Sequence, residues 1–405
     1  MCPVAGIFVS CHRVYKIRNV MIRSGISSLR RCGLAFPVIA ALSFALVAPS
    51  CKKAVVTPEP EPEPVLPPVI EEPAYKDLSK DGTANCYLVS DAGDYKFKAV
   101  QGNSDNAVGD VSDVDVLWES FGTNVAPAAG TLISSVSFKD GFVRFATPET
   151  FSEGNAVIAA RNSDGKILWS WHIWCSKEGW KEQEYFKGAG TMMDRNLGAL
   201  SATPGNVGAL GLFYQWGRKD PFLGSSDIDE NEKALSTGEW TASDSQVSND
   251  AAKENPMTFY TGENNCLPDG NWASQKTVYD PCPAGWRVPD GGSNDVWKKA
   301  LGKSGRLTGY TVDKKNKGIE FGGILGSSES IWYPGAGILS NSDFRLSNVR
   351  VYTYGYYWTA TENTGKNSAW IFYFNYSGDL QVANEFYVIS RSNGYSVRCC
   401  KENEL

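Results

Sequence analysis

Histidine is nearly absent from this chain of 405 residues, which contains only two. His12 lies in a basic leader, so His172 is the only imidazole left for a folded domain. The sequence also has no Gly-x-Ser-x-Gly elbow for a serine nucleophile and no Gly-x-x-x-x-Gly-Lys-Ser/Thr loop for phosphate. These absences exclude the commonest hydrolase and nucleotide-binding motifs. We therefore expect no catalytic residue, no metal site and no cofactor, and a structural place for His172.

Basic residues are scarce outside the leader. The first fifty residues hold six Lys or Arg and no acidic residue, which leaves 33 of the 39 basic residues against all 45 acidic ones from Cys51 onward, a net charge of −12. A surface that binds nucleic acid needs clustered positive charge. We expect a solvated acidic surface and no nucleic-acid partner.

The apolar stretch at 34–48, LAFPVIAALSFALVA, has fifteen residues and is short for a membrane-spanning helix, which needs about 20. Three arginines precede it after Met21, so residues 1–50 have the proportions of a signal peptide that starts at Met21. The following Pro-Ser-Cys-Lys-Lys resembles a bacterial lipoprotein lipobox, in a form close to that of Bacteroidota. The resemblance implies that Cys51 carries lipid and anchors the protein in the outer membrane, exposed at the cell surface. The alternative is an ordinary cleaved signal with a chance cysteine.

A proline- and glutamate-rich segment separates the lipid-attachment site from the rest of the chain. TPEPEPEPVLPPVIEEP, at 57–73, favours polyproline II, which extends by about 3.1 Å per residue and so reaches on the order of 50 Å here. Repulsion between the glutamates keeps such a segment extended. We expect residues 51–74 to form a stalk that holds the folded part away from a membrane.

Short alternating runs of apolar and polar residues fill 75–176. Asp-Gly pairs lie between two pairs of these runs, as tight hairpins with positive φ require. Seven strands in about 100 residues without a helical period predict an immunoglobulin-like β-sandwich. The expected strands are 84–90, 94–100, 113–120, 132–138, 141–147, 155–161 and 166–175.

The last expected strand, KILWSWHIWC at 166–175, is apolar on both faces. One face can contact the sandwich core, and the other can be covered by the next domain. Cys86 lies in the first expected strand and Cys175 ends the last. Cysteines of exported proteins tend to pair, so we expect a Cys86–Cys175 bridge that ties the two ends of the domain together.

Residues 177–405 mix helical and strand patterns. NVGALGLFYQWG, at 206–217, has apolar residues at i, i+3, i+4 and i+7 and predicts a short helix. SNDVWKKALG, at 293–302, predicts a second helix capped by Ser293. Runs rich in aromatic residues follow and predict strands, so we expect an α+β domain. The proline-rich YDPCPAGWRVPDG at 279–291 predicts a rigid extended segment that leads into the second helix.

Several motifs occur here in a fixed order: MMDRNLGA, LFYQWGRKDPF, YDPCPAGWRVP, YWTATEN and NGYSVRCC. Together they resemble the Fibrobacter succinogenes major paralogous (FISUMP) domain carried by Bacteroidales lipoproteins, over roughly 191–400. That family is grouped with C-type-lectin-like folds. The resemblance implies a disulfide between Cys282 and Cys399, which would fasten the helix start to the last strand. It does not bring the calcium site of C-type lectins, because the Glu-Pro-Asn, Gln-Pro-Asp and Trp-Asn-Asp triplets are missing.

Cys400 is adjacent to Cys399, and neighbours in a strand face opposite sides, so the two need different partners. Cys266 is the remaining cysteine of this domain, and we expect it to pair with Cys400. Six cysteines after Cys51 allow 15 pairings, so other connectivities stay open. A zinc site is the rival interpretation, and the near absence of histidine argues against it.

The aromatic surface is the remaining candidate for function. Tyr333, Tyr354 and Tyr356 lie beside glycines, as in flat surfaces that bind sugars or proteins, whereas Trp358 is expected in the core. We expect a non-enzymatic lipoprotein that binds a glycan or a surface or host protein, adhesin-like or associated with fimbriae. The alternatives are a carbohydrate-active enzyme with an unidentified acid pair and a purely structural envelope protein. The polar segment at 194–195 is expected to form a buried ion pair or a turn cap.

Overall fold

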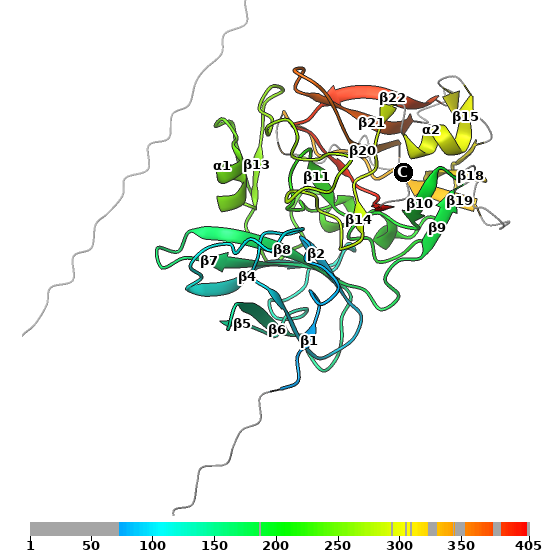
Figure 1. Ribbon diagram of the computed structural model, residues 1–405. Coiled ribbons are helices and arrows are strands. Elements are labelled where there is room, and N and C mark those ends of the chain that lie inside the picture. Colours follow the sequence, from blue (N-terminus) through cyan, green and yellow to red (C-terminus); the bar gives the residue numbers. More distant parts are fainter. Residues whose placement is uncertain are drawn as a thin grey trace, which may run out of the picture. The chain divides into compact units, whose positions relative to one another are not determined.

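The computed structural model describes residues 73–402, apart from 186–187, 293–294, 304–305, 308–309, 323–329, 343, 345–352 and 376–381. Contacts along the chain define one compact unit from Ile70 to Leu405. The expected signal peptide, Cys51 and most of the stalk lie outside the described residues. Within the described part, no helix combines the length and the apolar character needed to cross a bilayer. The architecture is mainly β (Figure 1).

Residues 75–176 form two four-stranded sheets (Figure 1). The first has the order β1-β3-β6-β5 and the second β2-β8-β7-β4. The seven runs of alternating residues predicted these strands to within a few residues, and only the two-residue β1 was missed. The strands are β1 (Lys76–Asp77), β2 (Cys86–Val89), β3 (Asp94–Lys98), β4 (Asp113–Ser120), β5 (Ser135–Lys139), β6 (Phe142–Ala146), β7 (Gly154–Arg161) and β8 (Ile167–Cys175).

The hairpin between β5 and β6 turns at Asp140 and Gly141, with φ of 52° and 79°. Positive φ at both positions is what an Asp-Gly turn supplies, because glycine and aspartate tolerate this region best. The turn pairs Lys139 with Phe142 and sets the register of the whole ribbon.

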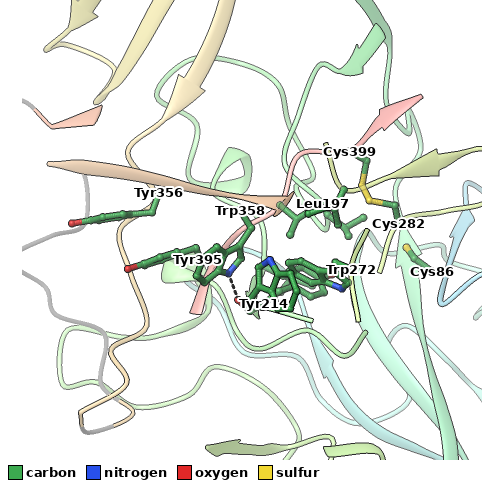
Figure 2. Close-up of a cluster of buried hydrophobic side chains, with 14 of the residues drawn as sticks. Cys86, Leu197, Tyr214, Trp272, Cys282, Tyr356, Trp358, Tyr395 and Cys399 are labelled. Atoms are coloured by element: carbon green, nitrogen blue, oxygen red, sulfur yellow. Dashed lines mark hydrogen bonds between the residues drawn. A yellow bond between two sulfur atoms is a disulfide. The ribbon is translucent and has the colours of Figure 1, made fainter. Parts of the chain in front are cut away.

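Strand β8 is buried on both faces, as its sequence predicted. Trp169 and Trp171 on one face join Phe97 and Phe145 of the other sheet in the sandwich core. On the opposite face, Trp174 belongs to a second core that also contains residues far beyond the sandwich, such as Trp358 and Tyr395 (Figure 2). The second face of β8 is therefore covered by the C-terminal half of the chain.

The described part of the C-terminal half contains several small sheets, two short α-helices and the 3₁₀-helices η2 and η3. A five-stranded sheet has the order β11-β23-β20-β21-β22, a four-stranded sheet β14-β24-β10-β9, and a three-stranded sheet β17-β18-β19. The helices are α1 (Asn249–Glu254), α2 (Val296–Leu301), η2 (Val207–Ala209) and η3 (Ser225–Asp227). The strands are β9 (Glu182–Tyr185), β10 (Gly190–Met193), β11 (Phe213–Gln215), β12 (Thr241–Ser243), β13 (Thr258–Tyr260), β14 (Trp286–Arg287), β15 (Gly302–Lys303), β16 (Arg306–Leu307), β17 (Tyr310–Asp313), β18 (Gly318–Gly322), β19 (Ser330–Pro334), β20 (Tyr354–Asn363), β21 (Ser368–Asn375), β22 (Val382–Ser390), β23 (Gly394–Ser396) and β24 (Cys400–Lys401).

The helix predicted over 206–217 was wrong. Only η2 is helical, and β11 follows it. Gly211 has φ of +71°, and a Cβ there would lie 2.9 Å from the carbonyl oxygen of Leu197. A helix cannot continue through Gly211, because a helix needs negative φ. Only glycine fits here, because the close approach to the Leu197 carbonyl oxygen leaves no room for a side chain.

The helix predicted over 293–302 is present as α2. Its start is fixed by Asp295, whose carboxylate accepts a hydrogen bond from the Lys298 N–H at 2.8 Å. The expected cap, Ser293, lies outside the described residues. Trp297 and Ala300 are buried on the inner face of the helix, as the spacing predicted.

The disulfide between Cys282 and Cys399 is present, so this prediction is confirmed (Figure 2). The bridge between Cys86 and Cys175 was wrong, because both cysteines are free and buried. In the parallel pair of β2 and β8, Val89 is the partner of Cys175, so Cys86 lies three residues away along the strand. That offset is about 10 Å and reverses the face, whereas a disulfide needs Cα atoms within about 7 Å.

The predicted pair of Cys266 and Cys400 was also wrong, because both are free. Cys399 and Cys400 do face different cores, as the strand alternation predicted. Cys400 is enclosed in a core with Trp297 and Phe372. Cys266 instead lies on a loop, where its sulfur is 3.5 Å from the carbonyl oxygen of Asn367. Sequence alternation gave the side that Cys400 faces but not the loop position of Cys266.

The proline-rich segment around Cys282 is held from two directions. The Asn85 amide of the sandwich donates to the carbonyl oxygens of Val278 and Asp280, both at 2.8 Å. From the other direction, the Lys276 ammonium donates to the carbonyl oxygens of Cys282 at 2.9 Å and Pro283 at 2.5 Å, and also to that of Trp286. The segment therefore joins the two halves of the chain as well as carrying the disulfide.

Candidate functional site

A cleft with a volume of about 1080 Å³ lies where the sandwich meets the rest of the compact unit. Clefts at such junctions are common ligand sites, and this volume is at the upper end of their usual range of about 300–1,000 Å³. We call it the junction cleft. Its lining residues are Phe121, Thr123, Glu153, Lys177, Glu178, Lys181, Glu182, Gln183, Asp194, Arg195, Leu200, Ser201, Ala202, Thr203, Pro204, Asn206, Gly208, Ser330 and Trp332.

The sandwich supplies one wall through the turn that follows β4. Phe121 and Thr123 line the cleft, and Gly122 between them has φ of +61°. The Gly122 N–H donates to a carboxylate oxygen of Asp227 at 2.9 Å, which fixes the turn against η3. This wall therefore depends on a hydrogen bond between residues 105 positions apart.

The lining of the junction cleft includes a buried ion pair. Arg195 Nε and Nη2 donate to the two carboxylate oxygens of Asp194 at 2.9 and 3.0 Å. Asp194 also accepts the Lys181 N–H, and its own N–H donates to the Lys181 carbonyl oxygen. Arg195 Nη1 has no hydrogen-bond partner within the described chain. The expected buried ion pair at 194–195 is confirmed, and it leaves one donor group of the guanidinium uncommitted.

Strand β19 supplies the opposite wall. Ile331 and Tyr333 point into a buried core, so Trp332 and Ser330 lie on the other face and line the cleft. The Trp332 indole packs against β18, where a Cβ on Gly318 would lie 2.4 Å from its Nε1 atom. Glycine at this position is what lets the ring lie flat on the neighbouring strand. Trp332 is 6% exposed, so it forms the cleft wall rather than a projecting platform.

Charge in the junction cleft is nearly balanced, with three basic and four acidic lining residues. Asp194 is paired with Arg195, and Glu182 forms an ion pair with Lys401 at 2.9 Å. The ammonium groups of Lys177 and Lys181 make no ion pair with any residue that the structure describes. The cleft therefore presents donors and acceptors together, without a strong field of one sign.

Two lining amides add to this mixture. The Asn206 side-chain oxygen accepts a hydrogen bond from the Gly208 N–H at 2.8 Å and caps η2. The NH₂ group of Asn206 takes no part in this cap and can donate to a ligand. Gln183 Oε1 is buried and has no hydrogen-bond partner in the described part of the chain. Amides that both donate and accept match ligands whose hydroxyl groups do the same.

Three tyrosines were predicted to form a binding platform, and for Tyr333 this prediction was wrong. It is fully buried, and its hydroxyl lies 2.7 Å from the Tyr185 hydroxyl and accepts from Trp297 Nε1 at 2.8 Å. The Arg398 guanidinium also lies 3.7 Å from its ring centre. Tyr333 is a core residue because its side chain follows the inward alternation of β19. The segment 332–337 does reach a cleft, but through Trp332.

Tyr354 and Tyr356 lie together on one face of β20, with ring centres 5.9 Å apart. Tyr354 is half-buried, whereas Tyr356 is only 6% exposed and stacks on Tyr395 at 4.7 Å. Figure 2 shows Tyr356 at one end of a buried cluster, with its hydroxyl directed away from the cluster. Trp358 continues inward and donates from Nε1 to the Tyr214 carbonyl oxygen at 2.7 Å, so its predicted core position is confirmed. Tyr354, Tyr356 and Trp358 belong to one hydrophobic cluster and Tyr333 to another, so they do not form one surface.

His172 is 2% exposed, and its Nε2 lies 2.9 Å from Asn155 Oδ1. Burial lowers the pKa of its imidazole to about 3, because the charged form loses its hydration. The ring is therefore neutral and structural, as predicted.

A buried polar cluster that sequence reasoning missed joins β8 to the C-terminal half. The Lys219 ammonium donates to the Ser170 hydroxyl at 2.7 Å and to the Asp220 carboxylate at 2.6 Å, and Ser170 donates to the same carboxylate. Serine beside lysine can act as a nucleophile and base. Here all three side chains are at most 4% exposed, and Ser170 lines none of the described clefts. The cluster serves the junction between the halves.

Across the described ranges, no group of three or more His, Cys, Asp or Glu residues is placed to hold a metal ion. No protein-family model, no curated protein and no solved structure matched this chain when it was compared with each. The geometry of the junction cleft is therefore the observation from which a function can be inferred.

Proposed function

We propose that this protein is a non-enzymatic binding module whose junction cleft takes an uncharged glycan. Glycan hydroxyl groups donate and accept hydrogen bonds at the same time. A site for them needs mixed polar groups rather than a single charge, together with some apolar wall. The junction cleft combines these features in Asn206, Gln183, Arg195 and Trp332.

The observation that carries this proposal is the arrangement of Arg195. Its guanidinium is locked on Asp194 through Nε and Nη2, and Nη1 remains buried without a partner in the described chain. A buried donor without an acceptor costs about 1–3 kcal/mol, and such groups in native proteins call for an explanation. An acceptor oxygen of a ligand bound beside Arg195 in the cleft lining would supply one.

The proposal is tested by screening the soluble fragment 75–405 on an array of glycans and host proteins. Thr203→Trp places a large ring in the cleft from an exposed position and should abolish glycan binding. Thr364→Trp, at an exposed turn outside the cleft, is the matched control and should bind as the parent does. Equal binding by both variants would place the ligand elsewhere, for example at Tyr354. Binding of a host protein without any glycan would replace the glycan by a protein partner.

We also propose that the module is presented at the cell surface as an outer-membrane lipoprotein anchored through Cys51, in the manner of the Bacteroidales lipoproteins that the sequence resembles. The basic and apolar leader and the Ser-Cys-Lys sequence support this. From the seven-strand pattern we propose that the two-sheet half is an immunoglobulin-like sandwich, and from the resemblance that the C-terminal half is a FISUMP domain of C-type-lectin-like fold. In cell fractionation, Cys51→Ala should move the protein from the membrane to the soluble fraction. A variant that stays with the membranes would contradict the anchor.

A carbohydrate-active enzyme is the second candidate, because four carboxylates line the junction cleft: Glu153, Glu178, Glu182 and Asp194. Glycosidases need one carboxylate that is free to act as an acid and a second across the scissile bond. Asp194 and Glu182 are committed to Arg195 and Lys401, which favours binding over hydrolysis. Release of reducing ends from a glycan that binds on the array would establish the enzyme, and its absence together with binding would support the module. A purely structural envelope role would be left if no ligand binds at all.

A further inference from the structure

Asp227 is a carboxyl group buried behind one wall of the junction cleft. Its side chain is fully covered, and it belongs to η3 of the C-terminal half. One carboxylate oxygen accepts the Gly122 N–H at 2.9 Å. The other makes no hydrogen bond of normal geometry within the described chain, although the Ser120 hydroxyl is close enough to favour the charged form slightly.

The hydrogen bond from Gly122 holds the cleft wall in place. Phe121 and Thr123, on either side of Gly122, both line the cleft. Gly122 also packs closely on a third lining residue, because a Cβ there would lie 3.3 Å from Leu200. The Asp227 carbonyl oxygen is fixed in turn by the Leu235 N–H at 2.7 Å. Release of the Asp227 side chain would therefore free a turn that forms part of the binding site.

Among the residues that the structure describes, no charge of opposite sign acts on Asp227. The groups that act on its ionisation are the N–H groups of Gly122 and Gly224 and the Ser120 hydroxyl, all of them neutral. The nearest acid along β4, Glu119, directs its carboxylate to the N–H groups of Leu132 and Ile133. η3 adds the Ser226 hydroxyl, and the N–H of Leu235 bonds to its backbone. The segment between them carries Asp229, Glu230, Glu232 and Lys233, and none of these is among the groups that act on the ionisation of Asp227.

We propose that Asp227 is a proton-controlled latch on the junction cleft, which holds the 121–123 turn closed when the carboxyl group is neutral and loosens it when the group ionises. The proposal rests on the proposed function for its biological meaning, because it concerns access to the same cleft. A buried carboxylate without a cation is unfavourable, and exposure to water is the available relief.

The pH range over which the turn opens follows from the pKa shift of Asp227. Burial raises the pKa of Asp227 from 3.8 to about 7 in the closed state. An exposed carboxyl group in the open state keeps a pKa near 4. The closed state therefore binds the proton more tightly, and its advantage is complete below about pH 4 and lost as the pH rises to about 7. Above about pH 7 the ratio of closed to open protein no longer changes with pH, because the carboxyl group is then ionised in both states. Opening should increase by up to tenfold per pH unit between these limits.

Hydrogen exchange measures this opening without a ligand. We expect the protection of the Gly122 amide, corrected for intrinsic exchange, to fall by up to tenfold per pH unit from about pH 4 to pH 7 in the purified chain from residue 52 onward. Asp227→Asn keeps the shape without the charge and should make this protection independent of pH. Asp229→Asn, a nearby acid that caps a different turn, should keep the parent's dependence. Amides of β7 report global unfolding and serve as the internal reference.

The outcomes separate the latch from the proposed function. A Gly122 protection that does not change with pH, or that changes equally in Asp227→Asn, overturns the latch whether or not glycans bind. A pH-dependent Gly122 amide in a protein that binds no glycan leaves the latch in place as a conformational switch and removes the proposed function instead. If both hold, glycan affinity should fall over the same pH range in the parent and stay level in Asp227→Asn.

Discussion

Adjacent side chains on β19 have opposite environments, although both are aromatic. Tyr333 is fully buried with Tyr185 and Trp297, whereas Trp332 lines the junction cleft. The difference follows from the alternation of a strand, in which neighbours point to opposite faces. Sequence reasoning recognised the aromatic segment but could not tell which of its two faces would be covered. That depends on which other strands meet it in the folded chain.

Tyr333→Ala should therefore lower the free energy of unfolding by roughly 3–5 kcal/mol, the usual cost of truncating a large buried ring. Tyr354→Ala, at a half-buried position, should cost about 1 kcal/mol or less. Urea unfolding of both variants measures the difference. Tyr333→Phe is the control, because it keeps the ring and removes only the hydroxyl that contacts Tyr185 and Trp297. Near-equal costs for the two alanine variants would contradict the buried position of Tyr333.

At the scale of elements, β8 connects the halves of the molecule through hydrogen bonds to a buried ion pair as well as through apolar packing. Lys219 and Asp220 reach its Ser170 from the C-terminal half and are both nearly inaccessible to water. A buried ion pair adds little stability as a whole, because desolvation offsets the attraction between the charges. The removal of one member is costly, since the other charge is left buried and unpaired.

Lys219→Met should thus destabilise the protein by about 3–5 kcal/mol, mainly through the uncompensated Asp220 carboxylate. Adding Asp220→Asn to this variant removes the stranded charge and should recover a large part of the loss. Denaturant unfolding of the two single variants and the double variant gives the coupling energy. If the two substitutions simply add, the two charges do not interact with each other beside Ser170.

Alternation predicted the strands of the sandwich well, because each strand has one face against a core and one toward solvent or the next layer. The same approach failed at 206–217, where the apolar spacing fits a helix but Gly211 needs positive φ and a close backbone contact. The junction cleft could not be predicted, since its residues come from turns and strand ends without a period. The motif at 194–195 was expected to form an ion pair or a turn cap, but its place in the lining of a cleft depends on the long-range packing of the chain.

At the scale of the whole molecule, one hydrophobic core runs through both halves. Trp118, Val157 and Trp174 of the sandwich pack in the same cluster as Trp216 and Trp358 of the C-terminal half. Whether the chain divides into separable domains at 176/177 stays a prediction. The shared core argues that neither half is complete without the other.

We expect a single cooperative unfolding transition, with equal calorimetric and van't Hoff enthalpies. The isolated fragment 75–176 should be much less stable than the same strands in the whole chain, because Trp118 and Trp174 would lose their cover. Differential scanning calorimetry of both proteins makes the comparison. Two resolved transitions, or a fragment that melts at the temperature of the whole chain, would show that the sandwich is independent.

The Lys276 ammonium, which gathers carbonyl oxygens of the turn after Cys282, performs the task that a bound metal ion performs in many loops. A metal ion exchanges with solution and can be removed by a chelator, but a cation on the chain has a fixed effective concentration at its site. Chelators and dilution should therefore leave this turn intact. The turn should be sensitive to high pH, because burial lowers the pKa of Lys276 and its charge is lost at a lower pH than that of a free lysine. The turn that fastens the two halves thus carries its own cation, which cannot dissociate from the chain but loses its charge at high pH.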